Sequence, residues 1–234
     1  MNRENKYTKM QSSYYESDAS LWTLEYRDPV VGSFDAHNNW DDYKYLFIDF
    51  ENLQEKVCLD FACGPGRNLV KYQKYFKRID GVDLAEKNLS NAKIWIDHNC
   101  EGSESRLIKC NGVDLENIED NTYDIVMSTI AMQHICVHEI RYNYLSEFYR
   151  ILKPKGWITI QMGFGSPSPA TVGYYENNYD ATGTNRACDT EIANEDQIKN
   201  DLLKIGYDNF RAFIRPCGPG DGHPNWIFFR AQKN

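Results

Sequence analysis

The chain has 234 residues, of which 41% are hydrophobic and 26% are charged. These fractions are close to those of average globular proteins, which excludes a largely disordered chain, and the length favours a single domain. The formal net charge of −8 argues against a nucleic-acid partner, since a protein that grips a phosphate backbone usually carries a basic patch.

The first 55 residues are rich in Tyr, Trp, Asp and Asn and show no clear period, whereas strands and helices alternate from Lys56 onward. Helix-like segments lie at 67–76, 86–98 and 139–152. Strand–helix–strand units imply a mostly parallel sheet with helices on both faces. Seven β-prone runs are expected, at 57–61, 78–82, 106–110, 123–129, 157–162, 207–214 and 226–231.

The last two runs are separated by the turn-rich segment 217–222, which predicts an antiparallel hairpin. The expected fold is therefore α/β, a Rossmann-like doubly wound sheet of seven strands with a C-terminal antiparallel hairpin. A polar insert at 163–190 interrupts the alternation. Polar stretches of this length are often lids or binding loops, although a surface excursion with little role stays open.

The cysteines are seven, an odd number, and none forms a CxxC pair. The sequence therefore gives no support for a metal site, and cysteines in apolar runs suit a reducing cytoplasm. No run approaches the ~20 apolar residues that a membrane span needs. We expect a cytoplasmic protein with no membrane partner, and the oligomeric state is left open between a monomer and a homodimer.

An apolar strand that ends in an acid and a glycine-rich turn is the strongest pattern, VCLDFACGPGRNL at 57–69. Glycines let the backbone turn tightly, and the following helix start offers unpaired N–H groups. Asp60 ends the strand where open α/β sheets bind ligands, so its carboxylate can hold an ammonium group. Asp83 ends the next strand, where a carboxylate suits ribose hydroxyls. Leu69 stands where the dinucleotide fingerprint needs a glycine, which argues against NAD.

The segment Leu59–Arg67 resembles motif I of class I S-adenosylmethionine-dependent methyltransferases. Further blocks follow in the family's order, and five blocks in the right order are much harder to obtain by chance than one. The second block is GVDL at 81–84, which is similar to motif II, and the third is NGVDL at 111–115, which follows the third strand. The fourth block, at 123–135, is similar to motif IV, and the fifth, at 147–158, precedes the fifth strand.

The resemblance implies S-adenosylmethionine as the cofactor. Many members have an aspartate at the position of Gly112, whereas in this chain the nearest acid, Asp114, lies two residues further on. The implied cofactor-binding residues are Asp60, Ala62, Gly64 and Gly66 around the methionine part, Asp83 at the ribose hydroxyls, Leu84, Gly112 and Val113 at the adenine, and Ser128 by the methionine amino group.

His134 is the candidate general base, because it follows the fourth strand and falls on the cofactor side if the motif alignment holds. An imidazole accepts a proton near neutral pH. The alternative is that His134 only packs or orients its loop. His223 in the hairpin turn is a second candidate for the base, ranked below His134.

We expect two variable segments to select the substrate. The first is the segment 1–55, which would act as a lid, and the second is the insert at 163–190 within the methyltransferase domain at 56–234. Ordinary packing remains the alternative for any single aromatic residue. The candidate substrate-binding residues are Tyr14, Tyr15, Trp22, Tyr174, Tyr175 and Tyr179.

These features predict transfer of a methyl group to an oxygen or nitrogen atom of a small molecule. The runner-up is a macromolecular methyltransferase acting on protein or RNA. A non-catalytic scaffold that binds the cofactor is the third hypothesis, and a dinucleotide-dependent oxidoreductase is the fourth.

Overall fold

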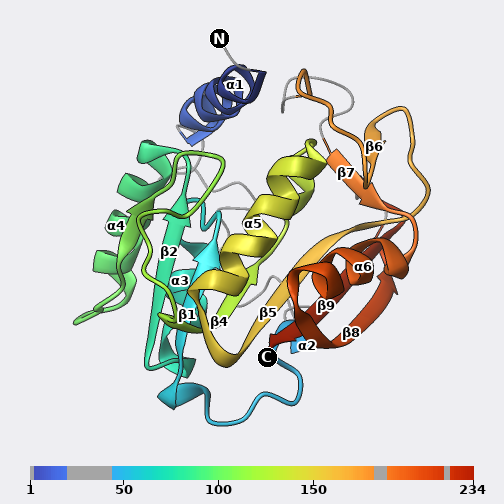
Figure 1. Cartoon of the computed structure of the whole chain (residues 1–234). Coiled ribbons are helices and arrows are strands. Elements are labelled where there is room, and N and C mark those ends of the chain that lie inside the picture. The colour runs from blue at the N-terminus through green and yellow to red at the C-terminus, as the bar shows by residue number, and fades with distance from the viewer. Residues whose placement is uncertain (1–2, 20–43, 182–188, 219–221) are drawn as a thin grey trace.

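A mixed β-sheet runs through the centre of the protein and carries helices on both faces (Figure 1). The computed structural model describes residues 3–19, 44–181, 189–218 and 222–234. Within them the sheet has nine strands. The mostly parallel Rossmann-like architecture is confirmed, and all seven expected strands are present.

Five parallel strands form the core of the sheet in the order β3-β2-β1-β4-β5. Nearly every residue of β1 and β2 is buried, as expected for parallel strands covered on both faces. The strands are β1 (Val57–Phe61), β2 (Arg78–Asp83), β3 (Leu107–Lys109), β4 (Tyr123–Ser128) and β5 (Leu152–Phe164).

The helices between these strands bury one face each against the sheet. Helices α3 (Arg67–Tyr72) and α4 (Glu86–Asn99) cover one face with the short α2 (Lys44–Phe47), and α5 (His138–Ile151) covers the other with α6 (Glu195–Ile205). Three short 3-10 helices complete the connections, η3 (Leu53–Glu55), η4 (Gln73–Tyr75) and η5 (Met132–His134).

The C-terminal strands β8 (Tyr207–Pro216) and β9 (Asn225–Lys233) form the expected antiparallel hairpin, and β9 also pairs antiparallel with β5. Helix α6 before them was not anticipated. Asn194 and Gln197 form a capping box at its start, and Gly206 ends it in the left-handed region at φ 117°.

The insert adds two strands to the expected seven, β6 (Thr171–Gly173) and β7 (Asp189–Ile192). Strand β7 pairs parallel with β5 at Gly163 and Phe164, beyond the last pair of β4 with β5 at Ser128 and Ile160. The insert therefore extends the sheet at the carboxyl end of β5. Both strands are too short and polar to stand out in the sequence.

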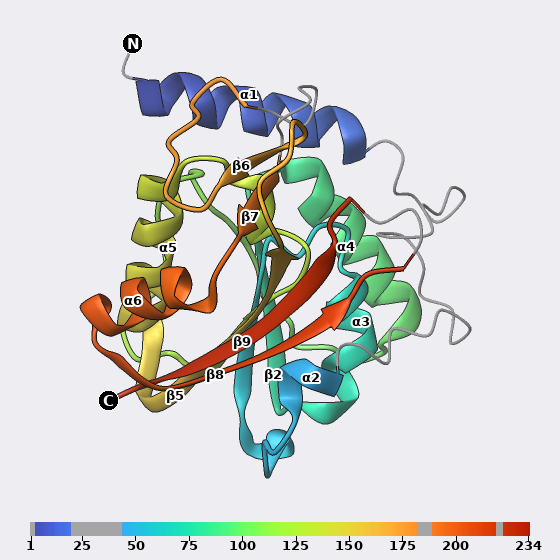
Figure 2. The same ribbon diagram turned by 90° about the vertical axis from the view of Figure 1, so that its right-hand side faces the viewer.

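Helix α1 (Arg3–Asp18) lies across the carboxyl edge of the parallel strands (Figures 1 and 2). The carboxylate of Glu16 accepts hydrogen bonds from the backbone N–H groups of Glu86 and Lys87 at the start of α4. Asn91 of α4 donates to the carbonyl of Ala19 at 2.9 Å. The end of α1 is thus tied to α4, which places the helix over the glycine turn.

Candidate functional site

A cavity of about 400 Å³ opens at the carboxyl edge of β1, β2 and β4, and residues of α1 form part of its lining. This volume is typical of small-molecule sites, which run from ~300 to 1,000 Å³. Eight of the predicted site residues line it, namely Tyr14, Tyr15, Ala62, Gly64, Asp83, Leu84, Gly112 and His134.

Asp83 organises two loops beside this cavity. Its Oδ2 accepts a hydrogen bond from the Gly64 N–H at 2.9 Å, and its Oδ1 accepts from the Ala85 N–H at 2.8 Å and from Asn88 at 3.2 Å. Burial raises the pKa of Asp83, while these hydrogen bonds oppose that rise. The carboxylate is therefore held in one orientation beside the glycine turn.

Asp60 is only 1% exposed and lies directly before the lining residues Phe61 and Ala62. Its Oδ1 accepts a 3.4 Å hydrogen bond from Asn68, which also donates to Thr129 at 2.9 Å. Within the described residues, Oδ2 is buried with no hydrogen-bond partner. Burial raises the pKa of Asp60 from 3.8 to about 7. A buried carboxylate oxygen without a donor fits the ammonium group of a bound amino acid.

Two non-glycine residues that line the cavity have left-handed backbones. Ala62 follows β1 at φ 54°, and Ile130 follows β4 at φ 53°. This conformation costs of order 1–3 kcal/mol for such residues and occurs often at ligand-binding loops. Both loops are therefore held in strained conformations next to the cavity.

Gly66 serves the packing of α3 against α4 rather than the cavity surface. It has φ 89°, and a Cβ there would lie 2.9 Å from the Cβ of Ala92. At Gly112, with φ 90°, a Cβ would lie 3.1 Å from the Cγ2 of Thr8 and 3.2 Å from the Cδ1 of Leu84. The absence of a side chain at Gly112 therefore allows Thr8 of α1 and Leu84 both to lie close to its backbone.

Two other predicted cofactor residues, Val113 and Ser128, do not line the described cavity. Ser128 is fully buried, and its hydroxyl donates to the Phe61 carbonyl at 3.2 Å. The next residue, Thr129, lines the cavity instead. Ser128 thus acts on the cavity only through the backbone at the end of β1.

His134 ends η5 and lines the cavity, and its side chain is 34% exposed. Its Nδ1 lies 2.5 Å from Oδ1 of Asp189 on β7. The other carboxylate oxygen of Asp189 lies 3.2 Å from Nε2 of His223. Burial alone would raise the pKa of Asp189, but hydrogen bonds with the two histidines outweigh it and hold that pKa well below its usual range.

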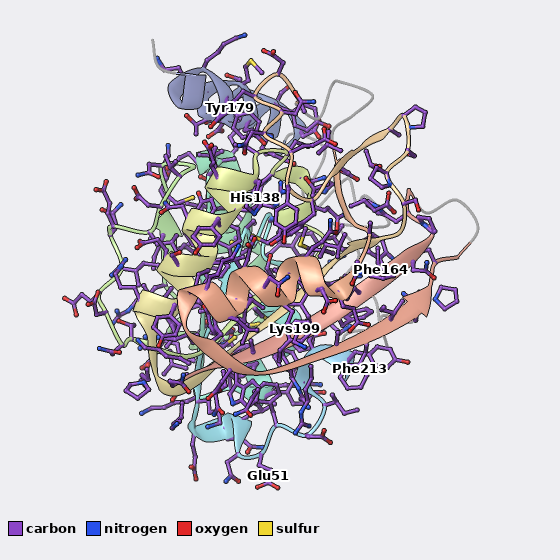
Figure 3. The ribbon with its side chains drawn as sticks, turned by 45° about the vertical axis from the view of Figure 1, so that its right-hand side comes forward. Glu51, His138, Phe164, Tyr179, Lys199 and Phe213 are labelled. Atoms are coloured by element: carbon purple, nitrogen blue, oxygen red, sulfur yellow. The ribbon has the colours of Figure 1, made fainter. Side chains whose placement is uncertain are left out.

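The tyrosines of the insert do not line this cavity, contrary to expectation. Tyr174 is buried and donates to Asp201 at 3.0 Å, whereas Tyr175 is exposed and donates to the Gln197 carbonyl at 3.1 Å. Tyr179 donates to Glu139 at 2.7 Å. Figure 3 shows Tyr179 close to α1 and away from α6. The three hydroxyls therefore bond to α5 and α6, and none of the three residues lines the described cavity.

Helix α1 contributes residues that sequence reasoning missed. Tyr7 is 2% exposed, and its hydroxyl accepts hydrogen bonds from the Cys136 N–H at 2.9 Å and from Gln11 at 2.6 Å. Gln11 also donates to the His134 carbonyl at 3.0 Å. Trp22 lies outside the described residues. Other lining residues absent from the prediction include Thr8, Asp18, Arg67 and Asn68.

A family model described as a methyltransferase domain matches residues 59–160. The probable S-adenosylmethionine-dependent methyltransferase CRG1 of Saccharomyces cerevisiae is 29% identical over 171 residues, which are 71% of this chain and 55% of that protein. The mRNA cap guanine-N(7) methyltransferase 1 of Arabidopsis thaliana is 29% identical over 152 residues, 57% of this chain and 40% of that protein. The chain thus matches only about half of these relatives' length.

Solved structures share the fold. Phosphoethanolamine N-methyltransferase 2 of Haemonchus contortus, in complex with phosphomonomethylethanolamine and S-adenosylhomocysteine, superposes with a TM-score of 0.67 and 18% identity. The match covers 100% of this chain and 61% of that one. Among the described residues, no helix is long and apolar enough to cross a membrane.

Proposed function

Because the chain belongs to the class I S-adenosylmethionine-dependent methyltransferases, we propose that it methylates an oxygen or nitrogen atom of a small molecule. The observation that carries this proposal is the cavity beneath α1, where five of the predicted cofactor residues and His134 line one space. An acceptor in that space would be close to both.

The cofactor residues fit S-adenosylmethionine part by part. Asp60 offers a buried carboxylate oxygen to the ammonium group, and Asp83 presents its oriented carboxylate to the ribose hydroxyls. Leu84 and Gly112 provide an apolar surface and an open backbone for the adenine. S-adenosylmethionine supplies a methyl group on a positively charged sulfur, which an acceptor attacks in line.

The side chains on the acceptor side would orient the acceptor and receive its proton. Tyr14 and Tyr15 of α1 provide aromatic walls on one side of the cavity. Orientation alone can supply ~7 to 11 kcal/mol of the barrier reduction. We assign proton removal to His134, which is needed for a hydroxyl acceptor and less so for a neutral amine.

A small molecule is favoured over a nucleic acid by the net charge of −8 and by the position of α1 over the cavity. The plant relative is named as an mRNA cap methyltransferase, so a macromolecular acceptor is the second candidate. We propose a cytoplasmic enzyme whose segment 1–55 acts as the substrate lid of the domain at 56–234.

Methyl transfer from labelled S-adenosylmethionine tests the choice of acceptor. The purified chain is incubated with pools of small metabolites, with capped RNA and with cell protein, in separate reactions. Label in a metabolite fraction supports the proposal. Label in RNA or protein alone would establish the second candidate, and label in no fraction despite cofactor binding would favour a scaffold.

A further inference from the structure

We infer that Asp189 is a positioning residue that fixes the neutral His134 ring in the tautomer with its proton on Nδ1, so that Nε2 accepts the acceptor's proton. This inference rests on the proposed function, because it gives His134 the role of the base. Asp189 belongs to β7, in the insert that the family resemblance did not cover.

The geometry assigns the two ring nitrogens different surroundings. Nδ1 of His134 faces Oδ1 of Asp189 at 2.5 Å, and an ionised carboxylate can only accept a hydrogen bond. A neutral imidazole has one donor and one acceptor nitrogen, so donation by Nδ1 leaves the Nε2 lone pair unprotonated. Asp189 does not line the cavity and His134 does, which leaves Nε2 as the ring nitrogen available to an acceptor.

Asp189 is itself held from behind by a second histidine. His223 is 5% exposed and lies between two carboxylates, with Nε2 3.2 Å from Asp189 and Nδ1 3.6 Å from Glu191. Glu191 in turn accepts a 3.0 Å hydrogen bond from Thr171 of β6. A side chain constrained at both oxygens keeps one orientation, as a group that must orient a base requires.

The backbone of β5 is shaped to admit this second histidine. A Cβ at Gly163 would lie 2.1 Å from Nδ1 of His223, and one at Gly165 would lie 2.8 Å from Oε1 of Glu191. Only glycine allows such close approach at these two positions. The two glycines therefore leave the space in which His223 and Glu191 pack behind Asp189.

The pair formed by His134 and Asp189 also stabilises the positive charge that forms on the His134 ring during transfer. The acceptor atom forms its bond to the methyl carbon while the carbon–sulfur bond breaks and its electron pair stays on sulfur. The proton released by the acceptor passes to Nε2 of His134. The resulting imidazolium lies against the Asp189 carboxylate in a partly buried, charge-assisted hydrogen bond, which is stronger than a neutral one.

The chain contains a matched reference pair outside the cavity. Nε2 of His138 lies 2.7 Å from Oδ2 of Asp201, which is 1% exposed. This carboxylate faces the other ring nitrogen, so neutral His138 is expected to carry its proton on Nε2. The two histidines should therefore show opposite tautomers in one protein.

Ring-nitrogen NMR of the nitrogen-15-labelled full chain with S-adenosylhomocysteine tests this assignment at pH 8. The spectra of His134→Gln and His138→Gln identify each ring by loss of its signals. We expect a protonated Nδ1 and an unprotonated Nε2 for His134 in the unmodified protein. The opposite tautomer there would overturn the inference without any variant of Asp189.

Asp189→Ala should shift His134 toward the tautomer protonated on Nε2, with His138 unchanged. Asp201→Asn should alter the ring signals of His138 and leave those of His134 as they are. An unchanged His134 tautomer in Asp189→Ala would overturn the inference. Because no methyl acceptor is needed, this result is independent of the search for the acceptor, and a failed search would count against the proposed function alone.

Discussion

The backbone N–H of Gly64 donates a 2.9 Å hydrogen bond to Oδ2 of Asp83. This bond joins the glycine turn after β1 to the end of β2, and Oδ1 of the same carboxylate accepts from the Ala85 N–H. One side chain therefore holds two loops that border the cavity.

Asp83→Ala should weaken the binding of S-adenosylhomocysteine by ~1 to 3 kcal/mol, about 5- to 150-fold, because hydrogen bonds to the ribose are lost. Stability should also fall, since the Gly64 and Ala85 N–H groups lose their acceptor. Calorimetric titration measures the affinity. Asp97→Ala, which removes an exposed carboxylate from an ion pair with Lys93, is the control, and an unchanged affinity in Asp83→Ala would remove the ribose assignment.

Asp60→Asn should raise the stability of the cofactor-free protein while abolishing cofactor binding. The pKa of Asp60 is raised from 3.8 to about 7 by burial, so the folded state holds an extra proton between these values. The contribution of Asp60 to stability therefore declines as pH rises through that window. Asparagine does not ionise. The free energy of unfolding of the Asp60→Asn variant at pH 8 should therefore exceed that of the unmodified protein by ~1 to 4 kcal/mol.

Denaturant titrations at pH 5 and pH 8 check this expectation. The stability difference between Asp60→Asn and the unmodified protein should be small at pH 5 and larger at pH 8. Cofactor affinity of the unmodified protein should decline as pH falls below about 7, because a protonated carboxyl attracts an ammonium group weakly. Equal cofactor affinity in Asp60→Asn would contradict the proposed ammonium contact.

His134→Ala should lower kcat by ~100-fold or more on a hydroxyl acceptor and leave cofactor affinity unchanged, because the base contributes only to proton transfer. Once an acceptor is identified, initial rates with saturating cofactor give the comparison. His98→Ala, at an exposed position of α4, is the matched control. Turnover near that of the unmodified protein would leave His134 as a packing residue.

Tyr7→Phe should destabilise the protein by ~1 to 3 kcal/mol, since the buried Cys136 N–H would lose the hydroxyl that accepts its hydrogen bond. The contact of α1 with the loop after β4 should also loosen and weaken cofactor binding. Denaturant unfolding and calorimetry measure the two effects. Tyr75→Phe alters an exposed ring and should change neither the free energy of unfolding nor the cofactor affinity. The same stability and affinity in the two variants would refute the anchoring role of Tyr7.

The parallel sheet and its glycine turn were predictable because each depends on neighbouring residues. Strand β1 is an apolar run with Asp60 near its end, and Ala62 and Gly64 of the turn that follows line the cavity. The same logic located Asp83 one strand later. Local sequence patterns therefore sufficed to predict the parallel strands and several of the residues that line the cavity at their carboxyl ends.

The other half depends on contacts between residues far apart in the chain. Tyr7 reaches the N–H of Cys136 across 129 positions, from a polar helix with no evident apolar period. Asp189 reaches His134 only because β7 pairs with the end of β5. Tyr174 packs instead on Asp201 of α6, a helix that was not anticipated. Composition identified these segments as aromatic and polar, but pairing decides which side chains face the cavity.

Calorimetric titration of the purified protein with S-adenosylmethionine, S-adenosylhomocysteine and NAD decides whether the chain binds the methyltransferase cofactor, and it needs no knowledge of the acceptor. We expect micromolar binding of the first two ligands and no binding of NAD. Binding of NAD alone, or of none of the three, would contradict the assignment to the methyltransferases.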